Sequence, residues 1–244
     1  MIGRVKVEIC LGCNQNLEAE VDAAYQGGAS TIELCSEMRH DGLTPLPEHI
    51  AIARKAFEDR CGLMVMIRPR PGDFRYSRDE LREMTEQVKV AAEKGANGVV
   101  FGVLDGQQNI DMRSLEPLVK TSQDLNLMST FHRAFDATSN SDESLDRLID
   151  LEIDRVLTSG VPWGKTGTAL DGLDRLQCTI EHAAGRIETV ICGGISAANA
   201  TPILDSLSTG LENVSIHAYS GAKEDGITTV TAVQALVNAA GATS

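Results

Sequence analysis

The chain carries the segment Glu8-Ile9-Cys10 and, 25 positions later, the similar segment Glu33-Leu34-Cys35. Each segment closes a short apolar run in which alternate side chains would face opposite sides of a strand. A separation of this length fits one strand, one helix and the return to a second, parallel strand. The pair therefore predicts two neighbouring parallel strands, each with a carboxylate and a thiol on one face.

The same rhythm continues through the rest of the sequence. Six further apolar runs follow, stretches of helical period separate them, and most runs end in a charged, thiol or glycine residue. Eight alternations of strand and helix in 244 residues predict a (β/α)8 barrel of the TIM class, forming one domain over residues 1–244. The expected strands are Val5–Ile9, Thr31–Leu34, Leu63–Ile67, Gly98–Phe101, Met128–Phe131, Arg155–Thr158, Thr189–Cys192 and Val214–His217.

Composition and charge restrict the classes of partner. The net charge of −13 disfavours nucleic acid and anionic membrane surfaces, because phosphate groups are bound through lysine and arginine. We recognise neither an N-terminal signal segment nor an apolar run long enough to span a membrane. Six cysteines without such a signal indicate reduced thiols in the cytoplasm rather than a disulfide framework.

Charged residues fall at the expected carboxyl ends of the strands, where TIM-barrel enzymes place their active sites. The candidate catalytic residues are Glu8, Glu33, Arg68 and His132. His132 would move a proton near neutral pH, a glutamate would be its partner base, and Arg68 would hold an anionic group. A structural Glu–Arg network that closes the barrel is the alternative. A divalent metal held by Glu8, Glu33 and His132 is a further variant.

A glycine-rich segment after the seventh run resembles the phosphate-binding loops of other barrels. Gly193 and Gly194 precede Ser196, which we expect to cap the next helix, so their backbone amides would bind an anion. Two glycines that make a tight turn are the alternative interpretation. The other candidates for binding a small anionic or sugar-like molecule follow different runs and are Arg70, Ser159 and His217.

The thiols form a second set of candidate ligands. Cys10-Leu11-Gly12-Cys13 is a C-x-x-C segment at the exit of the first strand, and Cys35 and Cys192 would stand on the same rim. Soft thiolates favour Cu(I) and zinc, whereas inert, half-buried thiols are the alternative interpretation. The sequence has neither a Walker loop nor a G-x-S-x-G segment, and no nucleotide cofactor is expected.

Several longer segments resemble the CutC family. Four of them are Ile32-Glu33-Leu34-Cys35-Ser36, Asp41-Gly42-Leu43-Thr44-Pro45, Met66-Ile67-Arg68-Pro69-Arg70 and Thr130-Phe131-His132-Arg133-Ala134-Phe135-Asp136. The resemblance implies a TIM barrel that is often a homo-oligomer and takes part in copper homeostasis. It also implies that Cys10 and Cys35 hold Cu(I). Cys13, where the family is expected to carry a small polar residue, is an additional thiol and a candidate third ligand.

The sequence is consistent with two functions. The first is a CutC-like cytoplasmic protein that binds or handles copper. The second is a TIM-barrel enzyme of the lyase or isomerase type that performs acid–base chemistry on a small anionic or sugar-like metabolite. A barrel that serves only as an oligomeric scaffold is a third interpretation, and the charges at the barrel mouth argue against it.

Overall fold

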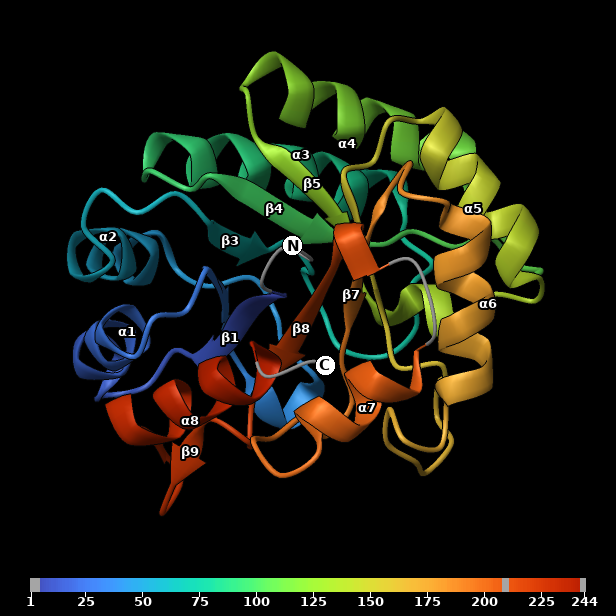
Figure 1. Ribbon diagram of the computed structural model, residues 1–244. Coiled ribbons are helices and arrows are strands. Elements are labelled where there is room, and N and C mark those ends of the chain that lie inside the picture. Colours follow the sequence, from blue (N-terminus) through green and yellow to red (C-terminus); the bar gives the residue numbers. More distant parts are fainter. Residues whose placement is uncertain (1–4, 208–210, 242–244) are drawn as a thin grey trace.

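The strands close into a barrel in the computed structural model, which describes residues 5–207 and 211–241. All eight run parallel, each pairs with the next along the chain, and β8 returns to β1, which confirms the predicted (β/α)8 architecture (Figure 1). The strands are β1 (Lys6–Gly12), β2 (Thr31–Cys35), β3 (Leu63–Met66), β4 (Gly98–Phe101), β5 (Met128–Phe131), β6 (Arg155–Thr158), β7 (Glu188–Ile191) and β8 (Val214–Ala218).

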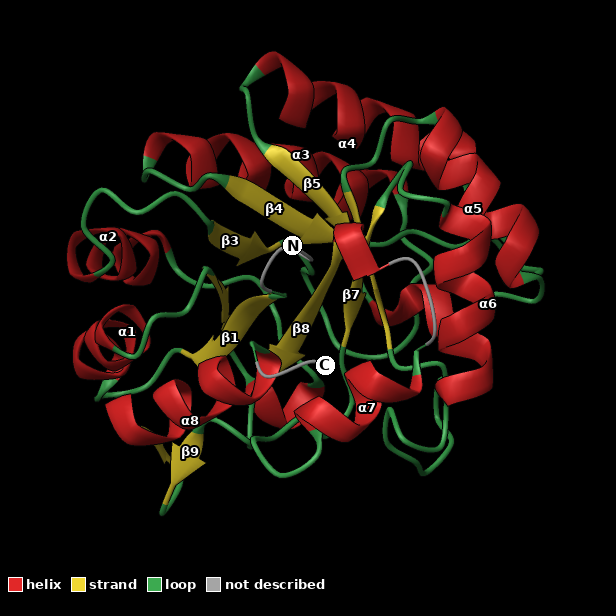
Figure 2. Cartoon of the chain, in the orientation of Figure 1, coloured by secondary structure: helices red, strands yellow, loops and turns green. Residues whose placement is uncertain are grey.

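Helices cover the outside of the barrel and leave the strands at its centre (Figure 2). One helix follows each barrel strand, and a two-stranded hairpin precedes the last helix. The helices are α1 (Leu17–Gln26), α2 (Pro47–Ala56), α3 (Arg78–Glu93), α4 (Met112–Asp124), α5 (Ser141–Asp150), α6 (Leu173–Ala183), α7 (Ala200–Ser206) and α8 (Val230–Ala240), and the hairpin strands are β9 (Lys223–Glu224) and β10 (Ile227–Thr228).

Alternation along the strands separates an aliphatic layer from a reactive barrel interior. In β1, Val7, Ile9 and Leu11 are buried in the main hydrophobic core between strands and helices. Burial of such side chains contributes about 25 cal/mol per Å² of apolar surface. Glu8 and Cys10 lie on the opposite face, where Glu8 reaches Arg155 of β6 across the barrel. The fold therefore places the strand carboxylates and thiols inside the barrel.

Capping side chains mark the starts of four helices, α3, α4, α5 and α8. Ser77 and Glu80 form a reciprocal capping box at the start of α3. The expectation that Ser196 caps the helix after β7 is wrong, because α7 begins only at Ala200. The side chain of Asn199 folds back over this loop and accepts the backbone N–H of Ser196 at 2.8 Å. That bond satisfies the amide before the helix starts.

Strand register and the loops bring distant residues to one end of the barrel. Glu8 lies opposite His217 of β8, and Cys10 lies opposite Glu33 of β2. Three short 3₁₀ segments are η1 (Met38–His40) in the long loop after β2, η2 (Arg133–Ala137) after β5, and η3 (Leu211–Asn213) before β8. None of the described helices is long and apolar enough to cross a membrane.

Candidate functional site

A pocket of about 300 Å³ opens at the carboxyl ends of the strands, and we call it the mouth pocket. Residues after β3, β5, β6 and β7 form its walls together with the ends of β1, β2 and β8. The residues that matter below are Cys10, Glu33, Cys35, Met38, Met66, Arg68, Phe74, His132, Arg133, Trp163, Gly193, Gly194 and His217. The pocket thus gathers Glu33, Arg68 and His132, three of the four candidate catalytic residues, whereas Glu8 does not line it.

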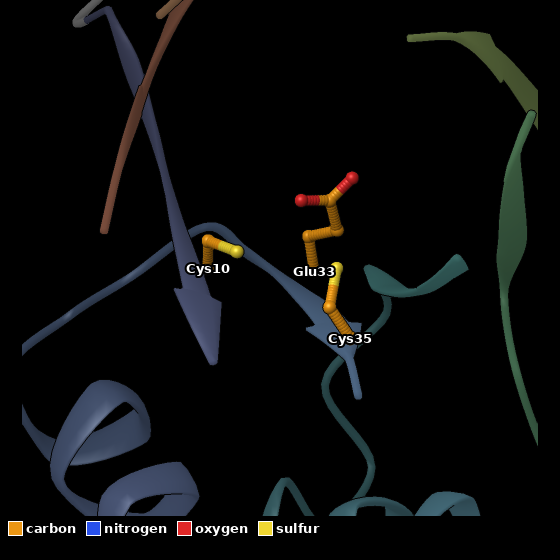
Figure 3. Close-up of side chains that lie close together, drawn as sticks. All are labelled: Cys10, Glu33 and Cys35. Carbon is orange, nitrogen blue, oxygen red and sulfur yellow. The ribbon is translucent and has the colours of Figure 1, made fainter. Parts of the chain in front are cut away.

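Cys10, Glu33 and Cys35 form a compact group on one side of the mouth pocket. Their ligand atoms all lie within 4.8 Å of one another, and all three residues are buried. Figure 3 shows the side chains projecting from β1 and β2 into a shared space. Cys13 is not a member of this group. It lines a separate depression at the surface, and its backbone N–H donates to the carbonyl of Cys35 at 2.8 Å.

Neighbouring charges divide the protons unequally within this group. The hydrogen bond from the Cys35 thiol, helped by His217, lowers the pKa of Cys10 to about 5 despite burial. The same bond to Cys10 and burial raise the pKa of Cys35 well above its usual value. Burial and the neighbouring Cys10 thiolate likewise raise the pKa of Glu33. At neutral pH, the Cys10 thiolate therefore lies beside the Cys35 thiol and beside a Glu33 carboxyl whose protonated form is favoured by burial and by that thiolate.

A fully paired network lies beneath Cys10, and Glu8 is at its centre. Glu8 accepts hydrogen bonds from Arg155 at 2.7 Å and from Thr31 at 2.8 Å, and its other oxygen is 3.0 Å from Nδ1 of His217. Burial opposes the charge of Glu8, but Arg155 and His217 outweigh it and hold the pKa of this carboxyl far below its usual range. Glu8 is therefore a buried anion below the mouth pocket and does not line it.

His217 links this network to the mouth pocket. Its Nδ1 faces Glu8, and its Nε2 lies 3.7 Å from the Glu33 carboxyl. Burial disfavours the imidazolium, but hydrogen bonds to Cys10 and Glu8 raise the pKa of His217 well above its usual value. A charged His217 in turn favours the Cys10 thiolate.

Arg68 is a buried cation held by backbone carbonyls. Its Nη1 donates to His40 at 2.7 Å and Gly42 at 3.1 Å, and its Nη2 donates to Gly72 at 3.0 Å. These bonds tie the loop after β2 to the loop after β3. Arg68 forms no ion pair with Glu8 or Glu33, because Arg155 occupies that position in the barrel interior.

His132 is a neutral imidazole with a fixed tautomer. Its Nδ1 accepts the backbone N–H of Ala134 at 3.1 Å, so the ring proton must sit on Nε2. Burial and the nearby Arg68 cation lower the pKa of His132 to about 3. At neutral pH the ring is therefore suited to donate a hydrogen bond from Nε2 rather than to exchange protons.

The expected anion-binding residues are only partly brought together. Gly193 and Gly194 line the mouth pocket, whereas Ser196 does not. Ser159 is buried near them, but its hydroxyl donates to Asp136 and accepts from Arg133, both at 2.9 Å. Arg70 lies outside the pocket and pairs with Glu80 at 2.5 Å and with Asp73 at 3.0 Å. The side chains of Arg70 and Ser159 thus have protein partners, and the amide of Ser196 bonds Asn199.

Two features of the site have signals in the sequence that are easily overlooked. Arg155 opens an otherwise apolar run, and Glu8, of opposite charge, lies inside the first run. Unlike charges inside apolar strands indicate a buried pair. The methionines Met38 and Met66, which border the thiols, resemble ordinary core residues, and only the closed barrel places them there.

Comparison with known proteins agrees with this geometry. The sequence pattern of the CutC family matches residues 5–240. A CutC family protein of Glaesserella parasuis is 40% identical over 201 residues, which cover 82% of this chain and 78% of the relative. A second relative, from Aliivibrio fischeri, is 36% identical over 217 residues, covering 88% of this chain and 83% of its own length.

Solved structures also resemble this chain, one of them from the CutC family. CutC from Streptococcus agalactiae, whose name refers to copper homeostasis, superposes with a TM-score of 0.76 at 29% identity over 87% of this chain and 98% of that one. A thiamine phosphate pyrophosphorylase from Pyrococcus furiosus shares only the fold, with a TM-score of 0.62 at 18% identity over 97% of this chain and 96% of that one. The CutC family pattern matches this chain over residues 5–240, nearly its whole length, and this shows that the chain belongs to the CutC family.

Proposed function

We propose that this protein binds Cu(I) in the mouth pocket through Cys10 and Cys35 and that it handles copper in the cytoplasm. The observation that carries the proposal is the approach of the two thiols and Glu33 to within 4.8 Å of one another. Cu(I) prefers soft sulfur ligands over carboxylates, so Cys10 and Cys35 would be the ligands and Glu33 a neighbour. In this proposal copper is the cargo of the protein and not a resident cofactor.

The surroundings of the thiols support a soft metal ion. Cys10 and Cys35 belong to a buried cluster with Met64, Met66 and Val100, and Met38 and Met128 pack against it. Thioether sulfur, like thiolate, is a ligand type that favours Cu(I). A pocket lined by sulfur is therefore better suited to Cu(I) than to a hard divalent cation. Glu8, Glu33 and His132, the alternative divalent site, do not form a ligand group among the described residues.

The electrostatics support a ready binding site. The Cys10 thiolate exists at neutral pH before any metal arrives, since its pKa is about 5. Only Cys35 has to lose a proton for both thiols to bind as thiolates. His217 then faces the metal-loaded thiolates with a positive charge, which offsets their negative charge.

Anaerobic titration with a competing Cu(I) chelator tests the proposal. We expect Cys10→Ser with Cys35→Ser to weaken Cu(I) binding by at least about a hundredfold, because both soft ligands are lost. Cys61→Ser with Cys178→Ser is the matched control, since both of these thiols are free and exposed. Equal Cu(I) affinity of the first double variant and the unmodified protein would refute the proposal.

Acid–base catalysis on a small metabolite is a second candidate, which one observation favours. His217 lies between Glu8 and Glu33, 3.0 Å and 3.7 Å from their oxygens. His217 is therefore better placed than the neutral His132 for proton transfer. A metabolite screen tests this candidate: turnover lost in His217→Gln but kept in His182→Gln, a histidine on the outer α6, would support it.

The free thiols support the proposed cytoplasmic setting. All six cysteines are free, which supports a reducing compartment such as the cytoplasm. A homo-oligomer, which the family implies, stays a prediction that light scattering of the purified protein tests.

A further inference from the structure

The wall of the mouth pocket that follows β3 holds a buried cation, Arg68, that has no ion-pair partner among the described residues. Arg68 is 2% exposed, and the partners of its guanidinium are the carbonyls of His40, Gly42 and Gly72. Within the described residues, no carboxylate forms an ion pair with it, and its Nε has no hydrogen-bond partner. Burying a charge is costly unless a partner compensates it.

A second donor without a partner lies beside Arg68. His132 is 4% exposed, and its Nε2, which carries the ring proton, has no partner among residues 5–207 and 211–241. Both groups flank one ring: the Arg68 Cζ atom is 5.3 Å from the Phe74 centroid, and the His132 ring is 4.9 Å from it. Two neighbouring donors on the wall of a pocket are satisfied together by one ligand with two acceptor oxygens.

We propose that Arg68 and His132 bind the carboxylate of a small organic acid in the mouth pocket, a binding activity separate from copper binding. The class of ligand follows from the charges and from the apolar lining. Arg68 is the one uncompensated cation of this wall, and His132 adds a donor without charge, which matches a single negative charge. Phe74, Trp163 and Leu157 line the same pocket and suit a small carbon skeleton.

A carboxylate fits this wall better than a phosphate does. A carboxylate presents two oxygens in one plane, which matches two donors, whereas a doubly charged phosphate has more oxygens than the wall has free donors. Arg133, the other arginine of the pocket, already pairs with Asp136 at 2.9 Å. The net charge of −13 also disfavours ligands with several negative charges.

Ligand-observed NMR titration with propionate, propionamide and inorganic phosphate tests this inference on the metal-free protein. Propionate should bind at least about tenfold more tightly than propionamide, because the amide lacks the charge that Arg68 compensates. Inorganic phosphate should bind more weakly than propionate. Equal binding of propionate and propionamide, or preference for phosphate, would overturn the proposal.

Two substitutions of His132 make the test specific without removing the buried cation. His132→Asn keeps an acceptor for the Ala134 N–H but removes the Nε2 donor, and it should weaken propionate about tenfold. His132→Gln restores a donor near the Nε2 position and should recover part of the affinity. Unchanged propionate affinity in His132→Asn would contradict the inference. Cu(I) titration of the same variant should be unaffected, so the two proposals fail separately.

Discussion

Two buried charges near the mouth pocket, Glu8 beneath it and Arg68 in its wall, differ in how they are compensated. Beneath the thiols, Glu8 has Arg155, Thr31 and His217 within hydrogen-bonding distance. In the wall after β3, Arg68 donates hydrogen bonds only to backbone carbonyls, and its Nε has no hydrogen-bond partner in the described structure. Glu8 therefore has its charge compensated by other side chains of the folded chain, whereas Arg68 lacks an anionic partner among the described residues. A bound carboxylate would supply that partner.

The largest loss of stability should come from breaking the buried network around Glu8. Glu8→Gln leaves Arg155 and His217 without their shared anion, and we expect a loss of about 3–5 kcal/mol in the free energy of unfolding. Urea denaturation measures it. The matched control is Glu18→Gln, which removes a carboxylate that is 67% exposed and lies 3.6 Å from Lys55. That change should cost at most about 1 kcal/mol. Equal costs for both changes would contradict a buried network.

Cu(I) affinity should rise with pH because of the protonated Cys35. Its pKa is raised well above the usual value, so binding as a thiolate releases one proton throughout the neutral range. From pH 6 to 8, affinity should increase about a hundredfold, or about 2.7 kcal/mol. Below about pH 5, where Cys10 also becomes protonated, the dependence should steepen. Chelator competition at several pH values measures the slope, and affinity independent of pH would exclude this proton release.

The wall that holds Arg68 and His132 can be perturbed at Gly102, because the missing side chain of this glycine leaves room for the His132 ring. A Cβ atom at Gly102 would lie 2.5 Å from Cε1 of His132, so Gly102→Ala must displace the ring or the strand end. We expect a stability loss of about 1–3 kcal/mol together with weaker propionate binding. Gly106→Ala, whose Cβ would meet only the end of Arg75 at 3.6 Å, is the control. Normal propionate binding in folded Gly102→Ala would show that the His132 position does not matter.

The smallest expected effect concerns the thioethers around the thiols. Met66→Leu preserves volume, so stability should change by less than about 1.5 kcal/mol. Cu(I) affinity should fall by about tenfold at most, while Zn(II) affinity stays the same, because thioethers favour Cu(I). Met84→Leu, a fully buried methionine of the helix layer, is the control. Parallel losses of Cu(I) and Zn(II) affinity would indicate a packing effect instead.

The sequence predicts the barrel well because local patterns carry it. The eight apolar runs correspond to the eight strands within a few residues, and the capping box at Ser77 marks α3. The late start of α7 could not be foreseen, because it depends on how the Asn199 side chain folds back over its loop. Serine in a loop and serine at a helix cap carry the same local signal.

The site is only partly predictable, since its pairings are distant. Glu33, Arg68 and His132 reach the mouth pocket because they end strands of one parallel barrel. The partner of Glu8, however, is Arg155 rather than Arg68, and these two residues come from β1 and β6, on opposite sides of the barrel. The tautomer of His132 also depends on one backbone N–H of η2, which strand patterns do not reveal.

X-ray absorption at the copper edge tests the central claim most directly, because it identifies the atoms bound to the metal. Protein loaded anaerobically with one equivalent of Cu(I) should show a first shell dominated by sulfur from Cys10 and Cys35. In Cys10→Ser with Cys35→Ser, that sulfur contribution should disappear. A first shell of nitrogen and oxygen alone, or the same sulfur signal in the double variant, would contradict copper binding at these thiols.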